Sequence, residues 1–386
     1  MSKKLLQDIY FTALNKVKAK NTIADNISID KNYLKIVDKK IPLKTFNNLF
    51  IFAVGKAAFD MAKKSEEILK DHIKGGVVIS NKDQKLKFLD NYQSSHPILT
   101  QKSIDSADHL IKKMKSLKKD DFYIFLLSGG ASAMIEKPMD GLNLDDFKKI
   151  SKALIGSGID ISALNSIRKS ISKVKGGKLA KFTKADGVTL VLSDVIGDDL
   201  GTIGSAPMYN KKVPHYIIAN NKIALDTAKK FISKKIKKVK VLTNTFDLSS
   251  EDAAKYILRT IKKYDEKHNE FCLLLGGETT TEVKGKGKGG RNQELALRLL
   301  LQNCITKDIS ILCAGSDGID GNSDSTGAFL DFDIYKKIDS LKIDPKTYLQ
   351  NSDSNSFFKK LKYDFTIGAT GTNVMDFIII LKQKNR

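Results

Sequence analysis

Short apolar runs alternate with longer amphipathic stretches along most of the chain. The runs are nearly continuous in hydrophobic side chains, which predicts strands buried on both faces. The stretches between them place apolar residues three and four positions apart, which is typical of helices with one buried side. The predicted strands cover residues 49–54, 76–80, 122–127, 188–192, 216–219, 239–242, 271–275, 309–314 and 377–381. The predicted helices cover residues 56–70, 103–117, 144–154, 222–234 and 250–264.

This alternation predicts an α/β fold with largely parallel sheets flanked by helices. The best candidate for a domain boundary lies near residues 209–214, after a stretch rich in glycine and proline and before a new strand. We therefore expect two domains, an N-terminal Rossmann-like domain over residues 1–212 and a C-terminal domain over residues 213–386. The last segment, residues 366–386, could return to the first domain as an additional strand.

Composition narrows the class of protein. The chain has 386 residues, of which 41% are hydrophobic, enough for a packed core. No apolar run reaches transmembrane length, and the amphipathic N-terminal helix, which contains Asp8, lacks signal-peptide features. We therefore expect a soluble cytoplasmic protein. Three cysteines, Cys272, Cys304 and Cys313, lack CxxC spacing and are predicted to be buried thiols in a reducing compartment.

The formal net charge of +22 raises the question of nucleic-acid binding. Lysine supplies nearly all of the positive charge and is spread along the whole chain, chiefly on predicted helix faces. Proteins that read nucleic acids favour the arginine fork and gather basic residues on one face. The pattern therefore favours a lysine-rich surface that could steer anionic substrates, with no nucleic-acid and no membrane partner. The sequence leaves a homodimer open.

Paired glycines follow two of the predicted strands. Ligands of open α/β sheets gather beyond the carboxyl ends of the strands, and glycine lets the backbone approach a phosphate closely. A tight turn without a ligand explains the first of these pairs equally well. The predicted ATP- and phosphate-binding residues of these turns and of the glycine-rich segment before Arg291 are Ser128, Gly129, Gly130, Ala131, Ser132, Gly276, Gly277, Glu278, Gly289 and Gly290.

A third glycine-rich segment, residues 285–290, precedes a helix that begins near Arg291. Mobile glycines, a helix N-terminus and a guanidinium together suit the oxygens of a phosphoryl group in transfer. The segment is neither a Walker A motif nor a dinucleotide fingerprint, because its glycines do not follow a strand directly. A flexible surface loop is the alternative interpretation.

Charged residues also follow predicted strands. Asp194 and Asp317 each end one, where a carboxylate can hold Mg²⁺ or accept a proton from an attacking hydroxyl. Lys56 follows the first strand through one glycine, so its charge lies at the same edge of the sheet, although it could equally be one more solvated lysine. Arg168 and Lys178 either bind anions or cover a helix face, and the sequence does not decide between the two.

Six segments in order along the chain give a family resemblance. They are LLSGGASAM, IRKSISKVKGGKLA, LVLSDVIGDD, GKGGRNQELAL, AGSDGIDGNSD and TGTNVMD. Together they resemble the ATP-dependent glycerate 2-kinases whose C-terminal part is called the MOFRL domain. The resemblance implies a two-domain enzyme with its active site in the interdomain cleft and with catalytic residues Lys56, Asp194 and Arg291. It also implies that the turn at residues 128–132 and the residues around Asn373 help to bind the nucleotide.

The predicted reaction is therefore phosphorylation of D-glycerate at its 2-hydroxyl, with ATP and Mg²⁺ as cofactors. Lys56, Arg168 and Arg291 are the predicted substrate contacts. Asp317 and Glu278 are the predicted metal ligands. Two other classes were weighed. A hydroxypyruvate reductase should carry a strand–GxGxxG–helix unit, which the sequence lacks, and a nucleic-acid-binding protein is suggested by charge alone.

Overall fold

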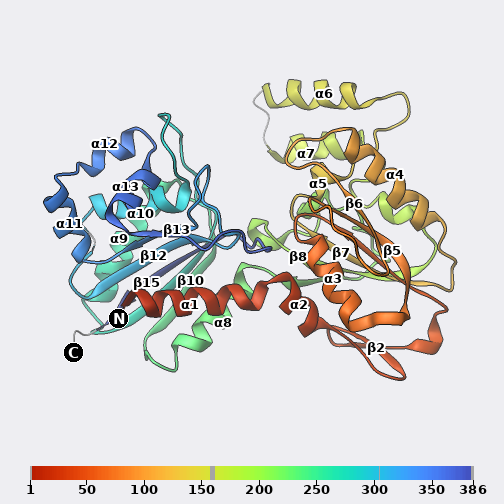
Figure 1. Cartoon of the computed structure of the whole chain (residues 1–386), viewed down its shortest axis with the longest axis horizontal. Helices are drawn as coiled ribbons and strands as arrows, with labels where there is room; N and C mark the ends of the chain where they lie inside the picture. The colour runs from red at the N-terminus through yellow and green to blue at the C-terminus, as the bar shows by residue number, and fades with distance from the viewer. Residues whose placement is uncertain (1, 157–160, 304, 384–386) are drawn as a thin grey trace. The chain divides into compact units, whose positions relative to one another are not determined.

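The computed structural model describes residues 2–156, 161–303 and 305–383, and it divides into two compact units. The N-terminal unit is Ala19–Ala219. The C-terminal unit combines Met1–Lys18 with Asn220–Arg386. Figure 1 shows that each unit is built on one large sheet flanked by helices. Five short 3₁₀ turns are η1 (Leu43–Thr45), η2 (Lys70–His72), η3 (Leu179–Phe182), η4 (Ile196–Asp198) and η5 (Ile203–Ser205).

A six-stranded parallel sheet forms the centre of the N-terminal unit. Its strands are β4 (Leu49–Val54), β5 (Ile73–Ser80), β6 (Asp90–Gln93), β7 (Phe122–Ser128), β8 (Asp186–Leu192) and β9 (His215–Ala219). In space they run in the order β6-β5-β4-β7-β8-β9, and every neighbouring pair is parallel. The chain builds outward from β4 on one side and from β7 on the other, as in doubly wound Rossmann-like sheets. The predicted α/β class is confirmed.

Helices cover both faces of this sheet. They are α2 (Ala19–Asn26), α3 (Ala58–Leu69), α4 (Gln101–Lys115), α5 (Ala131–Met134), α6 (Leu144–Gly156) and α7 (Ile161–Ser170). Phe50, Phe52 and Val54 of β4 share one buried cluster with α4, while α3 packs on β4 and β5 outside that cluster. Successive strand residues point to opposite faces, so two covered faces require a continuous apolar run. A small antiparallel sheet, β1 (Ile27–Ile29), β2 (Tyr33–Ile36) and β3 (Lys39–Pro42), completes the unit.

The C-terminal unit has a mixed six-stranded sheet in the order β10-β11-β15-β12-β13-β14. Its strands are β10 (Val239–Phe246), β11 (Phe271–Gly277), β12 (Ile309–Gly315), β13 (Gly327–Leu330), β14 (Asp364–Phe365) and β15 (Asp376–Lys382). Only β10 and β11 pair in parallel, because β15 runs antiparallel between β11 and β12 and the two outer pairs are antiparallel. Continuous apolar runs predicted burial on both faces correctly, but burial alone does not fix strand direction.

Figure 1 shows α1 and α8 along one face of this sheet and α10 on the other. The helices of the unit are α1 (Ser2–Val17), α8 (Asn221–Ile232), α9 (Ser250–Asp265), α10 (Arg291–Leu301), α11 (Asp333–Leu341), α12 (Pro345–Gln350) and α13 (Ser354–Leu361). The Tyr10 hydroxyl on α1 donates to the carbonyl oxygen of Gly315 at 2.7 Å, and its ring packs edge-on against Phe365 and Phe377. The N-terminal helix is therefore part of the C-terminal core.

These contacts correct the predicted domain boundaries in three places. Residues 2–18 belong to the C-terminal unit, and the chain passes between the units at Ala219 rather than near residue 212. The segment 209–214 is a loop inside the N-terminal unit, because β9 pairs with β8. The last strand, β15, does not return to the N-terminal unit but lies in the middle of the C-terminal sheet. Sequence composition detects a loop but not the partner of the strand that follows it.

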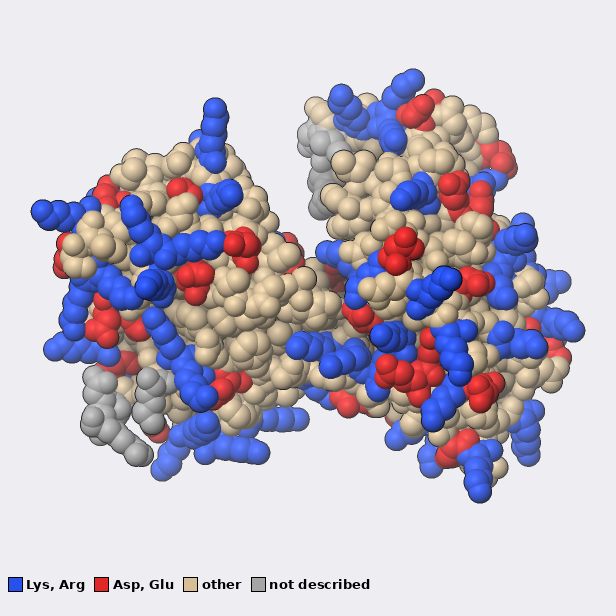
Figure 2. Space-filling model, viewed as in Figure 1, with Lys and Arg blue, Asp and Glu red and all other residues tan. Residues whose placement is uncertain are grey.

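Three further expectations concern the surface and the thiols. In residues 2–156, 161–303 and 305–383, no helix is long and apolar enough to cross a membrane. Cys272 and Cys313 are buried thiols, as predicted, whereas Cys304 lies outside the described residues. On the face drawn in Figure 2, lysine and arginine side chains are scattered, with acidic residues among them.

Candidate active site

The first candidate group lies where the strand order of the N-terminal sheet reverses, between β4 and β7. Ligands of doubly wound sheets bind at this position, beyond the carboxyl ends of the strands. The Lys56 N–H donates to the carbonyl oxygen of Gly129 at 2.9 Å, and the Ala57 N–H donates to Ser128 Oγ at 3.1 Å. The structure therefore brings together Lys56 and the predicted turn at residues 128–132.

Asp194, at the end of β8, completes this group. A Cβ atom at Gly129 would lie 1.7 Å from Asp194 Oδ2, so only glycine allows the carboxylate to approach the turn. Gly130 has a φ of +84°, and a Cβ there would lie 2.9 Å from His96 Cδ2 and 3.0 Å from Lys56 Cγ. Lys56, His96 and Asp194 therefore surround the two glycines.

Electrostatics within this group favour proton transfer. Burial raises the pKa of Asp194 above its ordinary value, and the nearby positive charge of Lys56 opposes that rise. Burial and the Lys56 charge both lower the pKa of His96. A carboxylate with a raised pKa is a stronger proton acceptor, which suits proton acceptance, one of the two roles that the sequence left open for Asp194.

A pocket of about 600 Å³ opens beside this turn, entirely within the N-terminal unit. Gly130 and Ser132 line it on one side, and Arg168 from α7 lines it on another. The Lys178 ammonium instead donates to the carbonyl oxygens of Lys169, Ser170 and Ser172, at 2.7, 3.1 and 2.7 Å. Of the two basic residues left open by the sequence, Arg168 therefore faces a pocket and Lys178 caps the end of a helix.

A buried ion pair contacts the backbone that follows the same glycine turn. Lys175 Nζ lies 2.9 Å from Glu136 Oε2, and the two side chains are 3% and 0% exposed. The same ammonium donates to the carbonyl oxygen of Ser132 at 2.6 Å. Because buried charges are stable only when paired and hydrogen-bonded, this pair fixes the backbone that follows Gly130.

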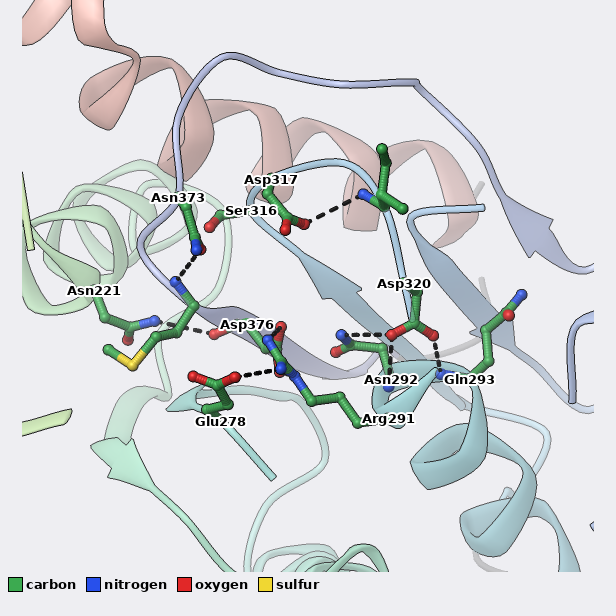
Figure 3. A network of polar contacts seen from close by, with 12 residues as sticks. Asn221, Glu278, Arg291, Asn292, Gln293, Ser316, Asp317, Asp320, Asn373 and Asp376 are labelled. Carbon is green, nitrogen blue, oxygen red and sulfur yellow. Dashed lines mark hydrogen bonds and ion pairs between the residues drawn. The ribbon is translucent and has the colours of Figure 1, made fainter. Parts of the chain in front are cut away.

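The second candidate group lies in the C-terminal unit and centres on Arg291, the first residue of α10 (Figure 3). Its Nε donates to Asp376 Oδ2 at 2.6 Å, its Nη2 donates to Asp376 Oδ1 at 3.1 Å, and its Nη1 pairs with Glu278. Burial opposes the guanidinium charge, but Asp376 and Glu278 outweigh it and raise the pKa of Arg291. Two acids from different strand ends therefore orient the predicted catalytic arginine.

The glycine-rich loop before α10 is anchored, and the expectation of mobile glycines is wrong. The Gly289 N–H donates to Asn322 Oδ1 at 2.8 Å, and the Lys288 N–H donates to Asp353 Oδ1 at 2.9 Å. Asp320 accepts the backbone N–H groups of Asn292 and Gln293, at 3.1 and 2.8 Å, and so caps α10. The loop therefore holds the start of the helix, and Arg291 with it, in one position.

Gly276 and Gly277 form the end of β11 rather than a separate turn. A Cβ at Gly276 would lie 1.9 Å from Asn221 Oδ1, and a Cβ at Gly277 would lie 2.3 Å from the Phe246 backbone. The Glu278 N–H donates to the Phe246 carbonyl oxygen at 2.8 Å, so it does not form the expected anion cradle. These glycines are explained by close packing, and their contact with a nucleotide stays a prediction.

Asp317 and Asn373 lie on adjacent loops of the C-terminal unit (Figure 3). Asp317 Oδ1 accepts the Ile319 N–H at 3.2 Å, and Asn373 Oδ1 accepts the Met375 N–H at 3.0 Å. Among the residues that the structure describes, no group of three or more His, Cys, Asp or Glu side chains is placed to hold a metal ion. Metal binding by Asp317 and Glu278 stays a prediction.

Sequence reasoning missed four side chains of these groups: His96, Glu136, Lys175 and Asp376. Two weak signals existed. Glu136 follows the segment LLSGGASAM by two residues, and Asp376 is the last residue of the segment TGTNVMD. Lys175 lies within the segment IRKSISKVKGGKLA, but the segment does not indicate which of its lysines is buried, because the partners of Lys175 are distant in sequence, at Ser132, Ile135 and Glu136.

Comparison with known proteins agrees with this geometry. A family model described as a domain of unknown function, DUF4147, matches residues 5–220, and the MOFRL family model matches residues 271–376. A D-glycerate 2-kinase of Thermotoga maritima is 32% identical, with 89% of this chain and 93% of the relative covered. A glycerate 2-kinase of Picrophilus torridus is 34% identical, with 91% and 90% covered.

A solved structure and one differently named relative complete the comparison. The crystal structure of a glycerate kinase from Thermotoga maritima superposes with a TM-score of 0.90 and 30% identity, over 99% of both chains. A relative from Agrobacterium vitis, 30% identical over 86% of this chain, carries hydroxypyruvate reductase in its name. The family models and the coverage of the kinase relatives place the chain in one family: it belongs to the glycerate 2-kinase family.

Proposed function

We propose that this protein transfers the γ-phosphoryl group of ATP to the 2-hydroxyl of D-glycerate, giving 2-phosphoglycerate and ADP. The observation that carries the proposal is the group formed by Lys56, Asp194 and the Gly129–Gly130 turn at the reversal point of a parallel sheet. It combines a carboxylate, a cation and a glycine turn where such sheets bind ligands. The kinase relatives named above support the substrate and the phosphoryl donor.

In this proposal Asp194 accepts the proton of the 2-hydroxyl as the hydroxyl oxygen attacks the γ-phosphorus. The new P–O bond forms while the bond to the β-phosphate oxygen breaks, and ADP leaves with that oxygen. Lys56 neutralises the substrate carboxylate or a phosphate oxygen, and Arg291 neutralises charge on the transferring phosphoryl group. Such transfers depend mainly on positioning and charge neutralisation.

Mg²⁺ fits the chemistry of the residues present. It commonly binds through one or two carboxylates together with water and the phosphates of the nucleotide, so it does not require a cluster of three protein ligands. Asp317, with Glu278, would hold it. When bound, it would neutralise charge on the phosphate oxygens. The Glu278 carboxylate would then be shared between the ion and Arg291, because its two oxygens can accept from both.

A nicotinamide-dependent hydroxypyruvate reductase is the competing function, because one relative carries that name and the N-terminal sheet has the strand order of dinucleotide-binding domains. The turn after the first strand of that sheet argues against it. It reads Gly55-Lys56-Ala57-Ala58-Phe59 and has one glycine where the dinucleotide fingerprint places three. A lysine in its second position suits an anionic substrate.

The decisive experiment is product identification by phosphorus NMR, with purified protein, ATP, Mg²⁺ and D-glycerate. We expect 2-phosphoglycerate and ADP. Exclusive formation of 3-phosphoglycerate would reject the regiochemistry, and NADH oxidation with hydroxypyruvate would favour the reductase. Cytoplasmic location and a homodimeric state are further parts of the proposal, and cell fractionation and light scattering test them. Omission of Mg²⁺, with chelator present, should abolish turnover.

A further inference from the structure

The pocket beside the Gly130 turn has an unusual charge balance. Its lining contains Lys148, Lys152, Arg168 and Lys175 and no acidic residue. Lys175 is paired with Glu136, but no described acid forms an ion pair with any of the other three. Three positive charges therefore share one concave surface without an ion-pair partner among the residues that the structure describes. Such a surface attracts a polyanion, because low-dielectric walls concentrate the field inside a cleft.

Size and the apolar part of the lining identify the ligand class. A pocket of about 600 Å³ lies within the range of about 300–1,000 Å³ that is typical of cofactor-sized ligands, whereas a three-carbon acid would leave most of it unfilled. Phe147 is buried and, with Ile98 and Leu99, supplies apolar surface beside the cations. The lining thus combines a wall suited to a heterocyclic base with cations suited to a chain of phosphates.

We propose that this pocket binds the nucleoside triphosphate, with Lys152 and Arg168 on the phosphates and Phe147 against the base. The inference rests on the proposed kinase function and adds the place of the nucleotide within the N-terminal unit. It reassigns Arg168 from the acceptor substrate to the phosphoryl donor. The Gly129–Gly130 turn lies at the edge of this pocket. The phosphate chain would therefore pass the turn on its way from the pocket toward Asp194.

Calorimetric titration of the full chain with a non-hydrolysable ATP analogue, in the absence of glycerate, tests the site. Arg168→Ala and Lys152→Ala should each weaken binding about tenfold or more, because each removes a charge-assisted contact. Lys149→Ala is the matched control, since it removes the same charge from the same helix outside the lining, and it should leave the affinity unchanged.

The KM for D-glycerate shows whether the pocket binds the nucleotide or the acceptor substrate. The proposal expects it to stay within about twofold in the Lys152→Ala and Arg168→Ala variants. Normal nucleotide affinity with a raised KM for glycerate would assign the pocket to the acceptor and overturn the proposal. Equal losses in Lys149→Ala and Lys152→Ala would show a general charge effect and also overturn it. Failure of the kinase function would appear separately, as absence of 2-phosphoglycerate with the unaltered protein.

Discussion

Arg291 and Asp376, 85 positions apart in the sequence, form a bidentate ion pair through bonds of 2.6 and 3.1 Å. Arg291 opens α10, and Asp376 opens β15, the antiparallel strand inserted between β11 and β12. The pair therefore joins a helix N-terminus to the centre of the C-terminal sheet. Because Asp376 is 3% exposed, its charge depends on the arginine for compensation.

Arg291→Ala should therefore affect stability and catalysis by separate routes. We expect a loss of about 2–3 kcal/mol in unfolding free energy, below the roughly 3–5 kcal/mol for a fully buried pair because Arg291 is 30% exposed. If the arginine also stabilises the transition state, kcat should fall by about 10²–10³. Chemical denaturation and steady-state kinetics measure the two effects.

The double variant Arg291→Ala/Asp376→Asn separates them. It should regain most of the lost stability, because the buried Asp376 charge is gone and the remaining Glu278 carboxylate is 43% exposed to water, but its kcat should stay low. Recovery of kcat together with stability would show that the arginine acts only through the fold. Arg259→Ala is the matched control, since Arg259 is exposed on α9, whereas Arg298 is unsuitable because it pairs with Glu294 at 3.0 Å.

Asp194 and Lys56 give a pH prediction. If Asp194 is the base, kcat/KM should fall as the pH drops through its raised pKa, because the carboxylate must be deprotonated to accept a proton. Lys56 opposes the rise in that pKa, so Lys56→Met should move the acid limb of the residual activity to higher pH. The exposed turn residue Asp199 provides the control variant, Asp199→Asn, which should leave the limb in place. If the acid limb of the pH profile does not move in Lys56→Met, the group that titrates in this limb is not Asp194.

The strand runs and the loops that carry chemistry were predictable because they depend on local pattern. The predicted strands at residues 49–54 and 271–275 correspond to β4 and to most of β11, and the turns after them were recognised from residue type. Partners distant in sequence were not predictable. Nothing near Arg291 indicates that Asp376 will face it, and nothing in residues 285–290 shows that Asn322 and Asp353 hold that loop. The glycines suggested a mobile segment, whereas the structure holds it by hydrogen bonds to residues distant in sequence.

Two glycines with nearly the same φ allow the effect of backbone strain on stability to be distinguished from an effect on activity. Gly130 has a φ of +84° and Gly141 a φ of +87°, but a Cβ would touch His96 and Lys56 at the first and nothing within 4 Å at the second. Alanine at either position should cost about 1–2 kcal/mol of stability from the left-handed conformation. Only Gly130→Ala should also lower kcat/KM, by displacing Lys56. Steady-state kinetics and thermal melting of both variants test this. Equal kcat/KM in the two variants would show that the Gly129–Gly130 turn is not part of the active site.

The buried pair of Lys175 and Glu136 allows a test of positioning that does not depend on overall stability. Lys175→Met leaves the Glu136 carboxylate without a counter-charge at 0% exposure, which should cost about 3–5 kcal/mol. Lys175→Met/Glu136→Leu removes both charges and fills similar volume, so it should regain most of that loss. It cannot restore the bond from Lys175 Nζ to the Ser132 carbonyl oxygen, which holds the backbone after Gly130. We therefore expect a double variant that melts near the temperature of the unaltered protein but has a raised KM for ATP, while its KM for glycerate changes little. A double variant with normal KM for both substrates would show that the pair only stabilises the N-terminal unit.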